Sequence, residues 1–306
     1  MKVLASRRLP GPAWVELDEV EYLSAPLPDG LGGVRPHVQA LAVVGERVDD
    51  RTLDLLPDLR VVANYGVGYD SIDTEACARR GVAVTNTPGV LDAPVADLTL
   101  ALILAVRRRL VEADRYVRER RWREDWARPY LVGDDLDGAT LGIVGLGRIG
   151  RQVARRARPF GLRLLYSQRN RLAPGDEEAE YRPLDDLFRE SDIVTLHVPL
   201  SPETRGLVDA RRLALLRDGA ALVNTARGAV VDEAALVAEL ASGRIRAALD
   251  VFAEEPGAPA ALLELPNVVL TPHIGSATTA TREAMTRLVV DNLLAAADGR
   301  PLVTPV

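Results

Sequence analysis

Hydrophobic residues occur in short runs along the chain, and Gly, Pro or polar residues bound each run. In the first ninety residues these runs cover 2–6, 40–45, 59–65 and 82–86. Short apolar runs between turn signals are typical of buried strands in a parallel sheet. The pattern therefore predicts four parallel strands of a first α/β domain. The stretch between Pro10 and Pro36 is rich in Pro and Gly, so the pattern defines the first crossover poorly.

A helical pattern begins at Asp92, which can cap a helix, and Pro94 suits the first turn. It continues through the apolar run 95–106 and on to Trp122. We predict one long helix. Its first half is apolar almost all round and should be buried between domains, against a second subunit or inside one chain. Its second half interleaves Arg with Glu and Asp, which indicates a solvated face.

Six further apolar runs follow, most of them separated by helical stretches, at 141–145, 162–167, 193–198, 221–225, 247–251 and 268–271. Strands and helices in this order predict a doubly wound sheet. A last helix, at about 279–297, comes too late to belong to that sheet and is expected to return to the first domain. The predicted fold class is α/β, with two Rossmann-like doubly wound domains. The cofactor domain, 93–276, is inserted into a flavodoxin-like substrate domain formed by 1–92 and 277–306.

The first strand of the inserted domain runs into a G-x-G-x-x-G motif made by Gly145, Gly147 and Gly150. In such a motif the first glycine permits a tight turn, the second lets the backbone approach a pyrophosphate, and the third lets helix pack on strand. The helix that opens at Arg148 and Ile149 adds N–H groups and the positive end of its dipole. The strand-to-helix context predicts a dinucleotide site. A glycine-rich turn in another kind of α/β protein is the structural alternative.

The second strand of this domain ends at Ser167, about 20 residues after the glycines, where a NAD-specific domain places Asp or Glu. A carboxylate would repel the 2′-phosphate of NADP, whereas Ser167 can donate a hydrogen bond to it and Arg169 can pair with it. We therefore predict that NADP(H) is preferred and that NAD(H) remains possible. The alternative is that Arg169 and Arg171 are solvated loop charges.

Three later strands end in polar residues, and open α/β sheets bind ligands at the carboxyl ends of their strands. Arg227 can hold a carboxylate, His273 can exchange a proton, and Glu255 can orient the imidazole and favour its charged form. Taken singly, each residue has a structural alternative: a surface ion pair, a helix-start carboxylate or a satisfied histidine. His197 lies inside an apolar run and is predicted to be structural.

The composition of the chain limits the kinds of partner that the protein is expected to bind. A chain of 306 residues suits two domains, and 47% hydrophobic with 27% charged residues is ordinary for a globular protein. A net charge of -6 argues against nucleic acid and anionic membranes, so a small molecule is the expected partner. No apolar run reaches the roughly 20 residues that cross a bilayer, and the N-terminal residues lack a secretory signal pattern. The single cysteine, Cys77, excludes an internal disulfide and a cysteine-cluster metal site and favours the cytoplasm. No metal site is predicted.

The chain resembles the D-2-hydroxyacid dehydrogenases. The resemblance rests on NYGVGYDSID at 64–73, NTPGV at 86–90, GIVGLGRIG at 142–150, LHVPLSPET at 196–204, NTARG at 224–228, ALDVFAEEP at 248–256 and LTPHIGSAT at 270–278. These motifs span essentially the whole chain in the family's order. The resemblance implies that Arg227 binds the carboxylate and keto groups of the substrate, and that His273 is the general acid–base, paired with Glu255.

It also implies that backbone N–H groups at Val67 and Gly68 bind the substrate carboxylate and that Asp250 contacts the nicotinamide carboxamide. Thr225 and Ala226 fall in the cofactor site, and the family's homodimer is expected. The motif wording is most similar to that of glyoxylate/hydroxypyruvate reductases. The predicted function is therefore hydride transfer between NAD(P)H and a small 2-keto acid or D-2-hydroxy acid.

Two alternatives stay open. A nicotinamide-sensing corepressor of the same fold carries the same Arg, Glu and His, although the chain shows no basic targeting run or disordered tail. A family relative acting on a larger or phosphonate-bearing 2-keto acid would carry the same motifs.

Overall fold

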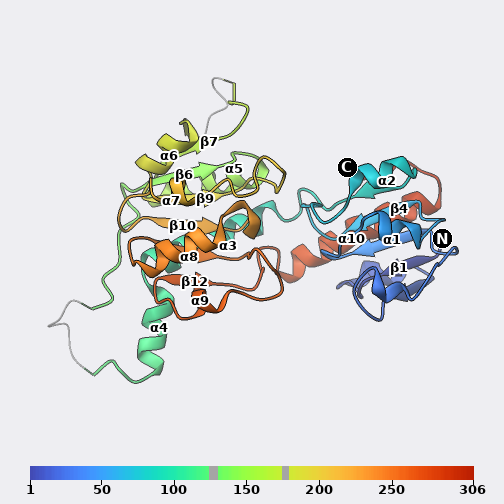
Figure 1. Ribbon diagram of the computed structural model, residues 1–306, viewed down its shortest axis with the longest axis horizontal. Coiled ribbons are helices and arrows are strands. Elements are labelled where there is room, and N and C mark those ends of the chain that lie inside the picture. The colour runs from blue at the N-terminus through green and yellow to red at the C-terminus, as the bar shows by residue number, and fades with distance from the viewer. Residues whose placement is uncertain (124–129, 174–178) are drawn as a thin grey trace. The chain divides into compact units, whose positions relative to one another are not determined.

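The protein forms two compact units, seen in a computed structural model that describes residues 1–123, 130–173 and 179–306 (Figure 1). One unit combines Met1–Leu91 with Ser276–Val306, and the other is Asp92–Gly275. Each unit is built on a parallel sheet. None of the described helices is both long and apolar enough to cross a membrane.

The described residues of the first unit form a five-stranded sheet in the order β2-β1-β3-β4-β5, which is the flavodoxin-like order. Its elements are β1 (Val3–Ala5), η1 (Pro12–Glu16), β2 (Val20–Tyr22), η2 (Asp29–Leu31), β3 (Ala40–Val43), α1 (Asp50–Asp54), β4 (Val61–Asn64), α2 (Thr74–Arg79), β5 (Ala83–Thr85) and α10 (Thr279–Ala297). Helix α10 packs on β4 and η1 and so belongs to this unit. Strand β2 was not predicted, because it is a short edge strand in the Pro-rich crossover and pairs with β1 alone.

The described residues of the second unit form a seven-stranded sheet in the order β12-β11-β10-β9-β6-β7-β8. Read from β8, this is the dinucleotide-binding order 3-2-1-4-5-6 with one further strand. The strands are β6 (Thr140–Val144), β7 (Arg163–Ser167), β8 (Glu180–Tyr181), β9 (Ile193–Leu196), β10 (Ala221–Asn224), β11 (Arg246–Leu249) and β12 (Val268–Leu270). Six of them were predicted. Strand β8 was not predicted, because it has only two residues and contains no apolar run.

The helices of the second unit connect these strands. They are α3 (Asp92–Arg107), α4 (Leu110–Arg118), α5 (Arg148–Ala157), η3 (Arg158–Phe160), α6 (Leu184–Glu190), α7 (Ala210–Leu213), η4 (Gly228–Val230), α8 (Glu233–Ala241) and α9 (Ala260–Leu263).

The prediction of one long helix from Asp92 was wrong, because the helix breaks between α3 and α4. Arg109 adopts a left-handed backbone, with φ at 53°. The carbonyl of Arg107 accepts a hydrogen bond from the N–H of Asp134 at 3.0 Å, so a distant segment takes an acceptor that a continued helix would use. Arginine and leucine are good helix formers, and local propensity therefore gave no sign of the break.

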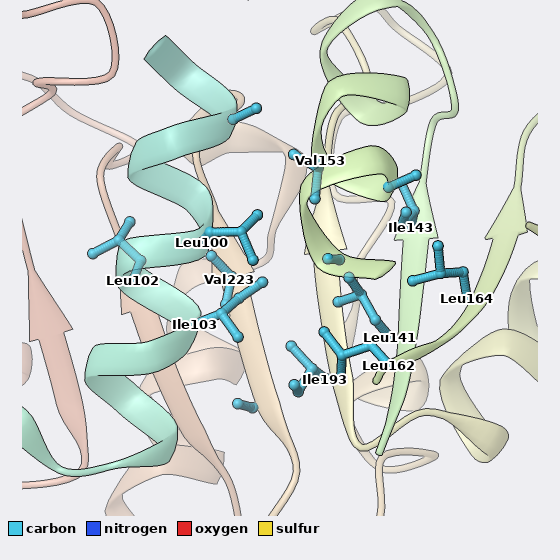
Figure 2. Packing of buried hydrophobic residues seen from close by; sticks show 14 of the residues in the cluster. Leu100, Leu102, Ile103, Leu141, Ile143, Val153, Leu162, Leu164, Ile193 and Val223 are labelled. Carbon is cyan, nitrogen blue, oxygen red and sulfur yellow. The ribbon is translucent and has the colours of Figure 1, made fainter. Parts of the chain in front are cut away.

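Helix α3 is buried inside its own unit, where it packs against α5, β10 and β11. Figure 2 shows Leu100 and Ile103 of α3 in one cluster with Ile143 of β6 and Val153 of α5. This apolar contact holds α5 on the sheet, and it fixes the turn that carries the three glycines at the end of β6.

Candidate active site

The glycine turn between β6 and α5 is too tight for other residues at two positions. Gly145 has a φ of 95°, and a Cβ there would lie 2.7 Å from the carbonyl oxygen of His197. A Cβ on Gly150 would lie 2.2 Å from the carbonyl oxygen of Gly145. Gly147 differs, because it is exposed and nothing lies within 4 Å of an added Cβ. The open side of the turn therefore has room for a ligand against the backbone.

The N–H groups on this open side are available to an anion. Among the described residues, those of Gly147, Arg148 and Ile149 donate no hydrogen bond, as expected in the first turn of a helix. Backbone N–H groups at a helix N-terminus suit a phosphate. The Arg148 side chain turns aside and pairs with Asp92 at 2.9 Å. The turn thus fits the pyrophosphate of a dinucleotide, and the N–H groups would hold it.

The end of β7 lies beside this turn. The carbonyl of Ser167 accepts from the N–H of Gly145 at 2.8 Å, and Oε1 of Gln168 accepts from the N–H of Leu146 at 3.1 Å. Gln168 was not predicted. Its side chain ties the ends of β6 and β7 together, and an amide that directly follows a strand end was the available signal.

The two loop arginines after β7 differ in their surroundings. The guanidinium of Arg171 lies over the ring of Tyr181, 5.0 Å from its centre. Arg169 is exposed and lies close enough to Glu203 to act on it. The pKa of Glu203 is lowered first by the Ser201 hydroxyl, then by its own backbone N–H, and further by the charge of Arg169. Arg169 is therefore the better candidate for binding an added phosphate.

Arg227, Glu255 and His273 follow three neighbouring strands, β10, β11 and β12. Because these strands are parallel, their carboxyl ends lie at one edge of the sheet. The structure thus gathers the segments that carry the predicted cation, carboxylate and imidazole.

Glu255 and His273 are in direct contact. Nδ1 of His273 lies 2.6 Å from Oε2 of Glu255, while Oε1 of Glu255 accepts from the N–H of Phe252 at 2.9 Å. Burial alone would raise the pKa of Glu255, but the hydrogen bonds from His273 and Phe252 and the charges of His273 and Arg227 together lower it. Glu255 is therefore ionised near neutral pH. With Nδ1 engaged, Nε2 of His273 is the nitrogen left to exchange a proton with a substrate.

The backbone at His273 is strained, with a φ of 51° that non-glycine residues rarely adopt. Asp250 holds this turn in place. Its carbonyl accepts from the N–H of His273 at 2.9 Å, and its buried carboxylate accepts from the hydroxyl of Thr271 and from the N–H groups of Ile274 and Gly275 at 2.6, 2.8 and 2.9 Å. A left-handed residue costs about 1–2 kcal/mol, which these bonds offset. Asp250 therefore positions His273, and its contact with the nicotinamide carboxamide stays a prediction.

Buried Asn224 shapes the loop that carries Arg227. Its Oδ1 accepts from the N–H of Ala226 at 3.0 Å, and its Nδ2 donates to the carbonyl of Arg227 at 2.9 Å. A Cβ on Gly228 would lie 1.9 Å from the backbone of Phe252, so only glycine lets this loop approach the segment that leads to Glu255. Asn224 and Gly228 both belong to the NTARG motif, but the sequence had assigned neither a role.

Thr225, a predicted cofactor residue, and His197, which was predicted to be structural, follow the neighbouring strands β10 and β9. The hydroxyl of Thr225 lies 3.0 Å from that of Thr99 on α3. His197 follows β9, and its Nε2 lies 3.0 Å from the Thr195 hydroxyl. Burial lowers the pKa of His197 to about 3, so the ring is neutral. Among the described residues no three His, Cys, Asp or Glu side chains are placed to hold a metal ion.

Val67 and Gly68 lie in the first unit, in the partly buried turn that follows β4.

The glycine turn, its open helix N-terminus and the Glu255–His273 pair define a dinucleotide-dependent oxidoreductase. A family model, "D-isomer specific 2-hydroxyacid dehydrogenase, NAD binding domain", matches residues 100–275. The chain belongs to the D-isomer-specific 2-hydroxyacid dehydrogenase family. The predicted family and fold class are thereby confirmed, and the protein is a nicotinamide-dependent oxidoreductase of 2-hydroxy and 2-keto acids.

Known proteins match most or all of the chain. A glyoxylate reductase of Thermococcus kodakarensis is 50% identical over 272 residues, which cover 87% of this chain and 82% of that protein. A protein of Thermus thermophilus is 46% identical with a TM-score of 0.92, and the match covers 100% of both chains. An NADPH-dependent glyoxylate/hydroxypyruvate reductase of Sinorhizobium meliloti, solved with NADP and malonate, is 38% identical with a TM-score of 0.91, covering 100% of this chain and 96% of that one.

Proposed function

We propose that the protein reduces glyoxylate to glycolate or hydroxypyruvate to D-glycerate, with NADPH as the preferred reductant. The observation that carries the proposal is the 2.6 Å contact between His273 and the ionised Glu255 at an edge of the dinucleotide-binding sheet. The similarity to glyoxylate reductases supports the choice of substrate.

A nicotinamide cofactor held at the glycine turn would supply the hydride that reduces the keto carbon. Nε2 of His273 gives a proton to the keto oxygen as the carbonyl is reduced, and in the reverse direction it takes the proton back. Glu255 holds Nδ1 and stabilises the imidazolium. Arg227 orients the substrate through its carboxylate and keto groups, since a guanidinium forms two parallel hydrogen bonds to a carboxylate. The N–H groups of Val67 and Gly68 bind the carboxylate as well.

Steady-state kinetics on a panel of 2-keto acids, each with NADPH and with NADH, tests this function. We expect the highest kcat/KM for glyoxylate or hydroxypyruvate, and the D enantiomer as the product from hydroxypyruvate. Tight cofactor binding without turnover would point instead to a nicotinamide sensor of the corepressor type. A preference for a larger or phosphonate-bearing 2-keto acid would show that the protein belongs to the same family but acts on a different substrate.

The preference for NADPH rests on Ser167 and Arg169. The residues at the end of β7 and directly after it, 167–171, include no Asp or Glu that would repel a 2′-phosphate, and exposed Arg169 can pair with one. Arg169→Ser should raise KM for NADPH about tenfold or more and leave KM for NADH unchanged, as loss of one charge-assisted hydrogen bond predicts. Arg171→Ser is the matched control, since Arg171 stacks on Tyr181, and it should alter neither value. Equal or better kcat/KM with NADH in the wild type would refute the preference.

We also propose a homodimer in the cytoplasm. Helix α4 has no buried residue and exposes Leu110, Val111 and Val117. Beside it, Leu263 and Leu265 of the α9 region help to line a surface hollow of about 440 Å³. Exposed apolar side chains beside a hollow suit contact with a second protein surface. The lone, buried thiol of Cys77 fits a reducing compartment.

A further inference from the structure

The turn at Gly66–Gly68 has all three of its carbonyl groups tied to the protein. Nδ2 of Asn64 donates to the carbonyls of Gly66 and Gly68 at 3.1 and 2.9 Å. Nδ2 of Asn86 donates to the carbonyl of Val67 at 2.9 Å, and the N–H of Thr87 also donates to that of Gly66, at 3.0 Å. Two asparagine amides therefore set the direction of every peptide group in this turn.

Two of the three N–H groups of the same turn form no hydrogen bond within the described residues. That of Gly66 donates to the carbonyl of Asn64 at 3.0 Å, but within the described residues those of Val67 and Gly68 donate to nothing. Partly buried backbone N–H groups are normally paired, and successive free ones form a concave site for anions. Because all three carbonyl groups are hydrogen-bonded to the protein, the turn offers a ligand only the N–H groups of Val67 and Gly68.

Both asparagines are themselves held firmly. Asn64 ends β4 and is 2% exposed, so its amide has no competing water. The backbone of Asn86 bonds Thr304 twice, since its N–H donates to the Thr304 carbonyl at 3.3 Å and its carbonyl accepts from the Thr304 hydroxyl at 2.6 Å. Fully buried Asn292 of α10 binds Thr304 in turn, accepting from its N–H at 3.0 Å and donating to its hydroxyl at 2.8 Å. The residues at 303–306 thus help to fix a loop more than two hundred positions earlier.

We propose that Asn64 and Asn86 are positioning residues of the substrate site, which aim the N–H groups of Val67 and Gly68 at the carboxylate of the 2-keto acid. The identity of this anion rests on the proposed function. A peptide group that turned over would place a carbonyl oxygen against the carboxylate and replace attraction by repulsion. The amides prevent this without touching the substrate.

The test replaces each amide by an apolar side chain of similar size, in Asn64→Leu and Asn86→Leu, and measures kinetics with glyoxylate and NADPH. We expect KM for glyoxylate to rise about tenfold or more, as weaker hydrogen bonding to a charged group predicts. The kcat value and the Kd of NADPH should stay within about twofold, since the chemistry and the dinucleotide turn are unaltered. Asn86→Gln, which keeps an amide donor, should recover part of the loss.

Asn267→Leu is the matched control. Nδ2 of Asn267 also donates to two carbonyls, those of Leu240 and Ile245 at 2.9 and 2.8 Å, but in the other unit. It should lose stability and keep KM. If Asn86→Leu folds with the wild-type KM, the proposal is wrong. If Asn64→Leu fails to fold, the KM of Asn86→Leu decides whether the proposal holds. Asn86 is less buried, so its replacement should disturb folding less.

A binding experiment separates this proposal from the proposed function. Oxamate carries a carboxylate beside a carbonyl that hydride does not reduce. Adding it to the wild type should shift the amide NMR signals of Val67 and Gly68 whether or not the protein turns over any keto acid, and the shifts should weaken in Asn86→Leu. Shifts without turnover would leave the anion site standing and refute the reductase. Turnover without these shifts would refute the anion site alone.

Discussion

At the scale of single residues, His273 is the proposed general acid–base and also has a strained backbone. Its left-handed backbone persists because Asp250 engages the residues around it, and its ring is fixed because Glu255 holds Nδ1. The motif in the sequence supplied the three residue types. It gave no sign that Asp250 would brace the histidine, since that role depends on two strand ends lying side by side.

His273→Ala should lose far more turnover than cofactor affinity. A general acid contributes about 10²–10⁴-fold to a rate, so kcat for glyoxylate should fall by that factor while the Kd of NADPH changes little. Stopped-flow turnover and fluorescence titration measure the two quantities. Retained kcat would remove His273 from the acid–base role.

His197 should make the protein sensitive to acid. Its pKa is about 3 in the folded state and takes the ordinary histidine value of 6.5 in the unfolded chain, so between these values the unfolded chain binds a proton that the folded chain does not. The free energy of unfolding should therefore fall, as the pH is lowered through this window, by about 1.4 kcal/mol per unit from this group. In His197→Gln this contribution to the pH dependence of the free energy of unfolding should be absent. Urea unfolding at several pH values between about 4 and 7 measures it, and equal slopes for both proteins would contradict the assignment.

At the scale of elements, the β6–α5 turn shows that three glycines in one motif do different work. Gly145 and Gly150 are required by neighbouring backbone, while Gly147 faces open space. The break between α3 and α4 gives the complementary case, because a contact from Asp134 overrides a stretch of good helix formers.

This difference predicts opposite effects of two alanine substitutions. Gly147→Ala should keep the wild-type Tm and weaken NADPH binding about tenfold or more, since its methyl group would occupy the space that a pyrophosphate needs. Gly150→Ala should lose about 1–3 kcal/mol of stability, because its methyl group would overlap the carbonyl of Gly145. Calorimetry and cofactor titration on both variants test the pair. A Tm loss in Gly147→Ala equal to that in Gly150→Ala would show that the two glycines share one role.

At the scale of the whole molecule, two parallel sheets of different strand order are built from one chain that leaves the first unit and returns to it. The return places α10 on β4 and the residues at 303–306 beside Asn86. Helix α4 has no buried residue and exposes Leu110, Val111 and Val117, and we attribute this exposure to contact with a second copy of the chain.

Light scattering should therefore give a mass about twice 33.1 kDa for the wild type. Val111→Asp combined with Leu263→Asp should shift the protein toward 33.1 kDa, because a buried unpaired carboxylate is costly. Val34→Asp changes an exposed apolar residue of the other unit and serves as control. A monomeric wild type, or a double variant that stays dimeric, would rule out this face.

The sequence by itself determined the fold class and the place of the glycine turn, and it predicted Arg227, Glu255 and His273 as the candidate catalytic residues. These features are local, because the period of the apolar residues, the spacing of the glycines and the residues at the strand ends can each be read from neighbouring positions in the sequence. Only the tertiary structure decided the bracing of His273 by Asp250, the break after Arg107 and the hold of Asn64 and Asn86 on residues 66–68. The bracing of His273, the break after Arg107 and the hold of Asn86 each depend on a hydrogen bond between segments distant in sequence, and no local pattern records such a pairing.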